Sequence, residues 1–323
     1  MKRFDYTLSV APMMDWTDRH CRFFHRLLSP SAVLYTEMVT AAALIHGDAD
    51  RLLRYSREEH PVVLQLGGSD PTMMADAALL GAQAGYDAIN INVGCPSDRV
   101  QSGQFGACLM AEPKTVAECF RRMAEVVSVP VTVKTRLGID EHDNEAFFST
   151  FIDTVADAGC THFDVHARIA ILEGLSPKQN RDVPPLNYPR VYALKARRPE
   201  LTVCLNGGVR DFDAAKEHLQ YVDGVMIGRE AYQNPWSLTR FEHLVDPAFV
   251  TTRESVVDAM TDYVKRTVGR DHVQLKHITR HMLGLFSGEP GARRWRRTLS
   301  ENAHRPESTA ELIASAAASV AAV

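Results

Sequence analysis

Short apolar runs rich in β-branched residues recur eight times along the first 230 residues, and a stretch of helical periodicity follows each run. The runs occupy residues 7–11, 32–36, 62–66, 88–93, 131–134, 163–166, 201–205 and 224–227. Strands that alternate with helices pair in parallel through right-handed crossovers. Eight such units in about 240 residues favour a (β/α)8 barrel, because a flavodoxin-like open sheet would leave part of the pattern unexplained. The sequence therefore predicts an α/β fold built on a TIM barrel.

The pattern changes after residue 250, where helical spacing continues without strands. Val256, Met260 and Tyr263 fall on one helical face, and a second apolar face runs over residues 275–285. We therefore expect two domains, a catalytic barrel over residues 1–245 and a smaller all-helical domain over residues 246–323. The last residues, 315–323, are small and low in complexity, so we expect this end to fray.

The connection after the sixth predicted strand is unusually long. It covers residues 167–187, about twenty positions, and contains Gly174, Pro177, Pro184 and Pro185. Loops of this length in compact domains are usually functional or mobile. We therefore expect this loop to border a functional site.

Composition narrows the class of protein. With 45% hydrophobic and 24% charged residues the chain is typical of a globular protein, and it has neither a membrane-length apolar run nor the apolar segment of a signal peptide. The six cysteines show no C-x-x-C pair and no zinc-site spacing, so neither disulfides nor a metal are expected. We expect a cytoplasmic protein without membrane contact.

Charge is uneven along the chain, whose net charge is −4. Residues 251–323 carry 11 Lys and Arg against 8 Asp and Glu, or +3, which leaves −7 for residues 1–250. A basic appendage on an acidic body suits a polyanionic partner.

Polar residues and glycines stand where the predicted strands end, which is the catalytic face of a TIM barrel. Any one of them could simply cap a loop, but together they predict a pocket with a polar rim. They are Pro12, Met13, Glu37, Gln65, Asn90, Asn92, Lys134, Thr135, Arg136, His166, Asn206, Gly207, Gly208, Gly228 and Arg229.

Two glycine motifs at the last two strands indicate a phosphate site. Gly207-Gly208 and Gly228-Arg229 can expose backbone amides to a phosphate, with Arg229 as its counter-charge; the alternative is a pair of tight turns. No P-loop or dinucleotide fingerprint is present, so a mononucleotide such as FMN fits best. Lys134 would then lie near the flavin N1/O2 edge and Gln65 near the pyrimidine edge. Alternatively, Lys134 is a Schiff-base lysine of an aldolase.

The segment after the fourth predicted strand carries the candidate for catalysis. Asn90 and Asn92 lie on one face of the strand, and Gly94 and Pro96 frame Cys95 in a turn at the barrel rim. Most cysteines are simply buried apolar groups. In this frame Cys95 is a candidate nucleophile or, as a neutral thiol, a general acid.

Taken in order and spacing, these motifs resemble the tRNA-dihydrouridine synthases. The resemblance spans roughly residues 8–300, and the loop and C-terminal motifs are most similar to the A subfamily. The motifs are Ala11-Pro12-Met13, residues 90–110, Val133-Lys134-Thr135-Arg136, His166-Ala167-Arg168, Asn206-Gly207-Gly208, Gly228-Arg229, the loop segments 174–177 and 181–186, and residues 280–285 and 290–297.

The resemblance implies an FMN enzyme that is reduced by NADPH and then reduces the C5–C6 double bond of D-loop uridines at positions 20 and 20a of tRNA. Hydride would pass from flavin N5 to uracil C6, Cys95 would give the proton to C5, and Asn92 would hold the uracil. His166 could contact either FMN or the substrate. The implied FMN-binding residues are Ala11, Pro12, Met13, Gln65, Lys134, His166, Asn206, Gly207, Gly208, Gly228 and Arg229.

The same resemblance implies that basic residues bind tRNA on both sides of the barrel mouth. The target base is stacked in folded RNA, and its extraction costs a few kcal/mol that phosphate contacts can offset. The alternative for the cluster around Trp295 is a solvated helix face with a packed indole. The implied tRNA-binding residues are Arg168, Lys178, Arg181, Arg293, Arg294 and Arg297.

Two other functions compete with this interpretation. A flavoenzyme acting on a free pyrimidine, similar to dihydroorotate dehydrogenase, would share the barrel but have no use for a basic helical appendage. A non-catalytic RNA-binding barrel would not require Cys95 or Lys134. We expect tRNA as partner and a monomer.

Overall fold

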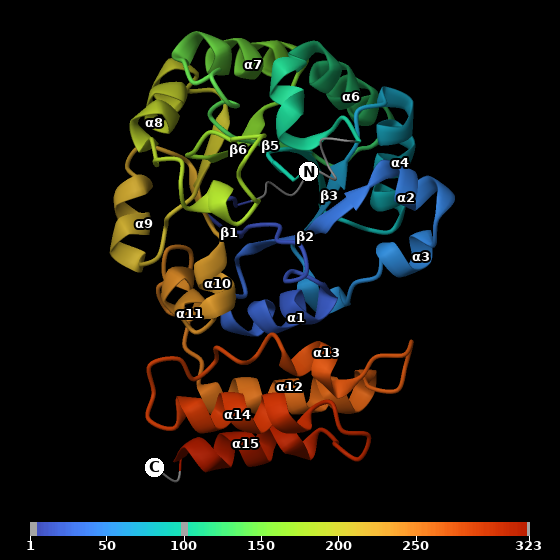
Figure 1. Cartoon of the computed structure of the whole chain (residues 1–323), viewed down its shortest axis with the longest axis vertical. Coiled ribbons are helices and arrows are strands. Elements are labelled where there is room, and N and C mark those ends of the chain that lie inside the picture. The colour runs from blue at the N-terminus through green and yellow to red at the C-terminus, as the bar shows by residue number, and fades with distance from the viewer. Residues whose placement is uncertain (1–4, 98–102, 322–323) are drawn as a thin grey trace.

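The computed structural model describes residues 5–97 and 103–321, and its centre is a closed barrel of eight parallel strands. Each strand pairs with the next along the chain, and the eighth closes on the first (Figure 1). The strands are β1 Leu8–Val10, β2 Val33–Thr40, β3 Val62–Gly67, β4 Ala88–Val93, β5 Val131–Thr135, β6 His162–His166, β7 Thr202–Asn206 and β8 Gly224–Ile227. The predicted TIM barrel is confirmed, with β2 running four residues beyond its predicted end at Thr36.

Helices surround the barrel (Figure 1). Several of them begin at a polar residue whose side chain caps the first turn. The side chains of Asp18, Asp70, Asn144 and Asp211 each accept backbone N–H bonds at a helix start, which satisfies donors that the helix leaves unpaired. The surrounding helices are α1 Arg19–Leu28, α2 Ala41–His46, α3 Ala49–Leu52, α4 Pro71–Gln83, α6 Pro113–Val126, α7 Glu145–Asp157, α8 Tyr188–Arg197, α9 Phe212–His218, α10 Arg229–Gln233 and α11 Ser237–Glu242, with short 3-10 helices at Arg57–Glu59, Gly106–Ala111 and Gln179–Arg181.

The C-terminal helices form a separate layer below the barrel, beside α1 and α11 in the view of Figure 1. They are α12 Arg253–Thr267, α13 Leu275–Thr279, α14 Ala292–Asn302 and α15 Glu311–Ala321. Aromatic packing joins the layer to α1, because the rings of Phe23 and Tyr263 stack with their centroids 4.0 Å apart. A buried hydrogen bond adds to this junction, with Tyr263 Oη 2.7 Å from Nδ1 of His20.

Two expectations for the C-terminal region are wrong. The apolar face over residues 275–285 is helical only to Thr279, and then continues as tight turns. The indole N–H of Trp295 donates to the Met282 carbonyl, and the Arg253 guanidinium donates to the Leu285 carbonyl. The first carbonyl therefore accepts a hydrogen bond from a side chain of α14, and the second accepts one from a side chain of α12. The expected fraying of residues 315–323 is also wrong as far as residue 321, because α15 runs to that point with Ala316 and Val320 buried.

None of the helices in residues 5–97 and 103–321 combines the length and apolar character that a membrane span requires.

Candidate active site

A cavity of about 1250 Å³ opens at the carboxyl ends of the barrel strands. Every residue predicted to bind the cofactor lines it, together with Cys95, Asn92 and Arg181. The structure thus brings the strand-end residues to one place, as the pattern of polar strand ends predicts. The predicted cofactor residues on its wall are Ala11, Pro12, Met13, Gln65, Lys134, His166, Asn206, Gly207, Gly208, Gly228 and Arg229.

The other predicted RNA-binding residues lie outside this cavity. Arg168 donates to the backbone carbonyls of Asp182 and Pro184, so its guanidinium holds the loop after β6. Lys178 lies in the same loop, next to Pro177 on the cavity wall. A further set is exposed on α14, in the C-terminal layer of Figure 1, and it comprises Arg293, Arg294 and Arg297.

Cys95 stands in the turn that the sequence predicts, and one side chain fixes that turn. Oδ1 of Asn92 accepts the backbone N–H groups of Gly94 at 3.1 Å and Cys95 at 3.0 Å. The thiol is half-buried and its sulfur lies 3.5 Å from the Ser97 hydroxyl. Residues 98–102 of the same motif lie outside the described residues. The turn thus presents a thiol on the cavity wall from a backbone that Asn92 restrains.

Arg136 holds the same turn from the other side, a role that sequence reasoning did not assign. Its Nε donates to the Gly94 carbonyl at 2.8 Å, and its Nη1 donates to the carbonyls of Ile169 at 2.9 Å and Asn180 at 3.1 Å. The side chain is 4% exposed, and burial lowers the pKa of Arg136 to about 10. The only signal in the sequence is its position two residues after Lys134. One buried cation therefore joins the Cys95 turn to the long loop after β6.

Lys134 lies on the cavity wall as a half-buried ammonium. Burial lowers the pKa of Lys134 to about 8, while the charge of Asp164 opposes that shift. Its Nζ donates to Oδ1 of Asn206 at 3.1 Å. At neutral pH most of this lysine carries its proton, so it supplies a positive charge rather than a free amine.

His166 is neutral, and it fits beside the turn after β7 because Gly207 has no side chain. Burial, together with the charges of Arg136 and Lys134, holds the pKa of His166 well below its usual range. A Cβ at Gly207, where φ is +108°, would lie 2.6 Å from Cδ2 of His166. Only glycine therefore allows the imidazole and the turn after β7 to approach so closely.

The rest of the predicted phosphate site combines bare backbone with two arginines. Gly208 has a φ of +76°, and a Cβ there would meet the Tyr188 hydroxyl at 2.5 Å, whereas a Cβ at Gly228 would find its nearest neighbour at 3.9 Å. Arg229 pairs with Asp182, with Nη2 2.7 Å from Oδ1. Nε of Arg181 is buried and has no hydrogen-bond partner within residues 5–97 and 103–321. The open wall at Gly228 and the guanidinium of Arg229 fit a phosphate-bearing mononucleotide such as FMN.

Comparisons with known proteins agree with this geometry. A family model described as dihydrouridine synthase matches residues 9–321. The chain is 55% identical over 318 residues to a "tRNA-dihydrouridine(20/20a) synthase" of Shewanella oneidensis, covering 97% of this chain and 93% of that protein. Proteins of the same name from Vibrio cholerae and Salmonella typhimurium are 56% and 59% identical, covering 97% and 93% of this chain and 96% and 91% of theirs.

Solved structures at low identity share the fold alone. The old yellow enzyme homologue from Zymomonas mobilis has a TM-score of 0.52 at 14% identity, covering 76% of this chain and 90% of that one. A 2-naphthoyl-CoA reductase complex has a TM-score of 0.55 at 9% identity, covering 72% of this chain and 49% of that one.

Proposed function

The chain belongs to the dihydrouridine synthase family, and on that basis we propose that it uses FMN and NADPH to reduce uridines 20 and 20a in the D-loop of tRNA. The family is FMN-dependent, and its members act on tRNA. The observation that carries the assignment is one cavity whose wall holds the predicted FMN residues and the Cys95 thiol.

FMN, when bound, supplies the hydride that adds to C6 of the uracil. The residues of this chain would bind and orient the FMN. Gly228 would leave room for the phosphate, Gly207 and Gly208 would shape the adjoining turn, and Arg229 would supply the counter-charge. Gln65 and the ammonium of Lys134 would lie beside the ring. His166, as a neutral imidazole, is available to either the cofactor or the substrate.

Cys95 is the proposed general acid. Its thiol holds the proton that C5 of the uracil must receive, since saturation of the C5–C6 bond adds one hydride and one proton. The turn keeps the sulfur on the cavity wall through the bonds from Asn92 and Arg136. Asn92 also lines the cavity, which supports its proposed role in binding the uracil.

Binding of tRNA would use basic residues on both sides of the cavity. The target base has to leave its stack, which costs a few kcal/mol, and phosphate contacts offset that cost. We propose Arg168, Lys178 and Arg181 near the cavity mouth for these contacts, and a second group on α14 for the rest of the RNA. That second group is Arg293, Arg294 and Arg297.

The finer organisation is also proposed. We divide the chain into a catalytic barrel, residues 1–245, and a helical tRNA-binding domain, residues 246–323. We place the enzyme in the cytoplasm with its RNA substrate, as a monomer whose reaction requires no metal. Sedimentation equilibrium and metal analysis of the purified protein test the last two statements.

The decisive experiment is the absorption spectrum of the purified protein, before and after anaerobic addition of NADPH, followed by addition of unmodified tRNA. We expect flavin bands that bleach with NADPH and recover with tRNA, and dihydrouridine at positions 20 and 20a. Recovery with free uracil or orotate but not with tRNA would support a free-pyrimidine enzyme. A protein that binds tRNA but cannot be reconstituted with FMN would support the non-catalytic RNA-binding function.

A further inference from the structure

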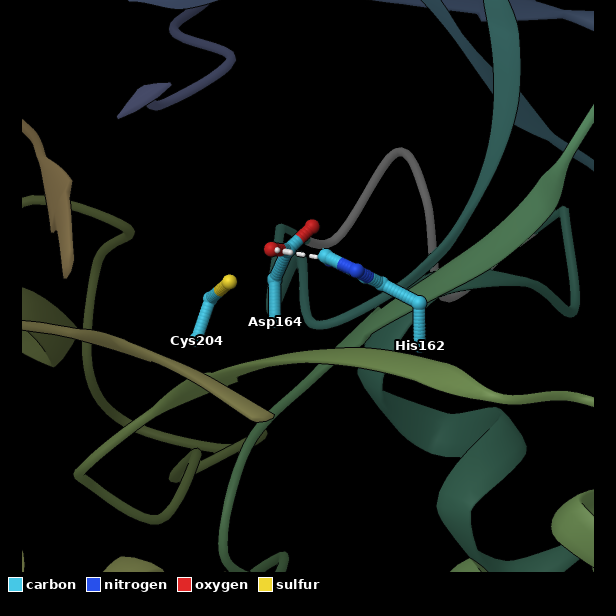
Figure 2. A group of neighbouring side chains, drawn as sticks. All are labelled: His162, Asp164 and Cys204. Atoms are coloured by element: carbon cyan, nitrogen blue, oxygen red, sulfur yellow. Dashed lines mark hydrogen bonds and ion pairs between the residues drawn. The ribbon is translucent and has the colours of Figure 1, made fainter. Parts of the chain in front are cut away.

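A fully buried carboxylate lies in the barrel interior beneath the proposed flavin site. Asp164, on β6, has no exposed surface and accepts bonds from three side chains. The Tyr35 hydroxyl lies 2.9 Å from Oδ2, Nε2 of His162 lies 2.9 Å from Oδ1 (Figure 2), and Nδ2 of Asn90 lies 3.4 Å from Oδ2. These three side chains come from strands β2, β6 and β4, so the carboxylate joins three strands across the barrel interior.

A chain of amides connects this carboxylate to the catalytic turn. Asn90 donates to Asp164 and also to the Thr132 hydroxyl at 2.8 Å. Gln65 Nε2 then donates to Asn90 Oδ1 at 2.8 Å, and Asn92 Nδ2 donates to Gln65 Oε1 at 2.8 Å. We call Asn90, Gln65 and Asn92 the amide chain; all three side chains are less than a tenth exposed.

Both ends of the amide chain impose the same direction. A carboxylate can only accept, so the NH2 end of Asn90 has to face Asp164. At the other end two backbone N–H groups, those of Gly94 and Cys95, can only donate, so the oxygen of Asn92 has to face them. One N–H of Asn92 goes to Gln65, and the second has no partner in the described part of the chain. Asn92 therefore offers the cavity a donor, which suits a carbonyl oxygen of uracil.

The same carboxylate also balances the charge of Lys134. The two residues are register partners on neighbouring strands β5 and β6, and both side chains point into the barrel. The other groups that act on the lysine are Arg136, Cys95 and His166, of which Arg136 carries a like charge. A buried cation without a nearby anion tends to lose its proton.

We propose that Asp164 is a positioning residue for the reaction: through Asn90 and Gln65 it holds Asn92 in the orientation that the Gly94 and Cys95 amides also select, and its carboxylate is the counter-charge of Lys134 inside the barrel. This inference rests on the proposed function. Asp164 does not line the cavity and acts only through these other residues.

A bound metal is the competing explanation of the same cluster. His162, Asp164 and Cys204 each offer a ligand atom, and these atoms lie within 4.8 Å of one another (Figure 2). Burial raises the pKa of the Cys204 thiol well above its usual range, and Asp164 adds to that shift, so the thiol is neutral here. One zinc ion per purified chain, absent from the Asp164→Asn protein, would overturn the proposal, because the metal would then occupy the carboxylate.

The test compares Asp164→Asn and Asn90→Leu with Cys204→Ala as a matched control, since Cys204 touches the carboxylate but not the amide chain. Both test variants should lower kcat/KM on tRNA about tenfold, the value of one hydrogen bond, while the control stays close to the wild type. Only Asp164→Asn should also shift the alkaline limb of the NADPH-bleaching rate to lower pH, because only this variant removes the anion that holds the lysine's proton. It should also weaken FMN binding by the apoprotein, measured from quenching of free flavin fluorescence.

The outcomes separate this inference from the proposed function. Wild-type protein that neither binds FMN nor reduces tRNA would contradict the proposed function. Wild-type activity with an Asp164→Asn protein of unchanged pH profile, FMN affinity and kcat/KM would overturn only the role of Asp164. If Asp164→Asn does not fold, Asn90→Leu decides: unchanged kcat/KM on tRNA overturns the proposal.

Discussion

Asp18, which caps the first barrel helix, forms an ion pair with Arg280 of the C-terminal layer: Oδ2 lies 2.6 Å from Nη2 of the arginine and 3.0 Å from Nε2 of His281. Oδ1 accepts the backbone N–H groups of His20 and Cys21. A single carboxylate therefore fixes the start of α1 and joins it to residues about 260 positions away in the sequence.

Replacement of Asp18 by Asn should destabilise the protein. The change weakens charge-assisted bonds to Arg280 and His281, and we expect the free energy of unfolding to fall by about 1–3 kcal/mol in urea denaturation at neutral pH. Asp213→Asn is the control, because Asp213 and its partner Arg240 are both exposed and such pairs contribute less than about 1 kcal/mol. Equal losses in the two variants would contradict the role of Asp18.

The stability that Asp18 contributes should depend on pH in the acid range. Burial alone would raise the pKa of Asp18, but hydrogen bonds from His281 and from the Cys21 amide outweigh burial, and the pKa lies well below its usual range. Such a group adds stability above the unfolded pKa of about 4, and that stability is lost as pH falls towards the folded pKa. The stability difference between wild type and Asp18→Asn should therefore shrink below about pH 4.

Cys95→Ala should separate the two halves of the reaction. Without the thiol the proton donor to C5 is missing, and we expect turnover on tRNA to fall by at least about a hundredfold. NADPH should still bleach the flavin. Cys108→Ala is the control, because that thiol is also half-buried but donates to the Phe105 carbonyl. Undiminished turnover in the Cys95 variant would exclude it as the general acid.

Arg136→Met should affect both stability and catalysis. Three carbonyl groups, one of them buried and two half-buried, lose their donor, which we expect to cost about 2–3 kcal/mol, and the Cys95 turn loses one of its two restraints. Thermal unfolding and single-turnover reduction of tRNA measure the two effects. Arg197→Met, which removes an exposed arginine paired with Asp153, should change neither. A loss of stability with unchanged single-turnover rate would show that the turn does not need Arg136.

Gly207→Ala should reduce retention of FMN. The new methyl group would meet both an unfavourable φ of +108° and the His166 ring at 2.6 Å. Gly174→Ala matches the strain without the contact, because its φ is +84° and nothing lies within 4 Å of the new Cβ. We expect flavin loss on gel filtration in the first variant only; flavin loss in both would assign the effect to backbone strain.

Charge reversal of both Arg294 and Arg297 should weaken tRNA binding without lowering flavin content. For each arginine that no longer pairs with a phosphate, the slope of log Kd against log salt concentration should fall by roughly one unit. Arg294 also donates to the Ser319 carbonyl, so thermal unfolding has to accompany the binding curves. Reversal of both Arg121 and Arg122 on α6, which changes the net charge by the same amount, is the control. Parallel loss of tRNA binding and flavin would show that the cluster is structural.

The strands were predictable from sequence because burial on both faces leaves a continuous apolar signal. The strand-end residues followed from them, since parallel strands end at one rim. The residues after Thr279 imitate a helix in sequence because their i to i+3 turns, such as Leu285 N–H to the Met282 carbonyl, keep apolar side chains inward at nearly helical spacing. The side-chain partners that interrupt the helix come from distant segments.

Long-range polar contacts explain what else was missed. Asp18 and Arg280 are each ordinary surface residues in the sequence, and only the packing of α1 against the C-terminal layer makes them partners. Asp164 gave a weak signal, as a single acid inside an apolar strand, but its partner Tyr35 lies 129 positions away. Such pairs depend on how strands close into a barrel, which local pattern does not encode.

The cavity at the barrel mouth has a kinetic consequence. Cys95, the proposed proton donor, and Lys134, a proposed flavin ligand, line the same space of about 1250 Å³. A nicotinamide and a nucleobase that both approach the flavin through this space have to take turns. We therefore expect two successive half-reactions: the nicotinamide reduces the flavin and leaves, and only then does the nucleobase bind and become reduced. RNA that binds before the flavin is reduced would occupy the entrance and slow the reduction of the flavin by NADPH.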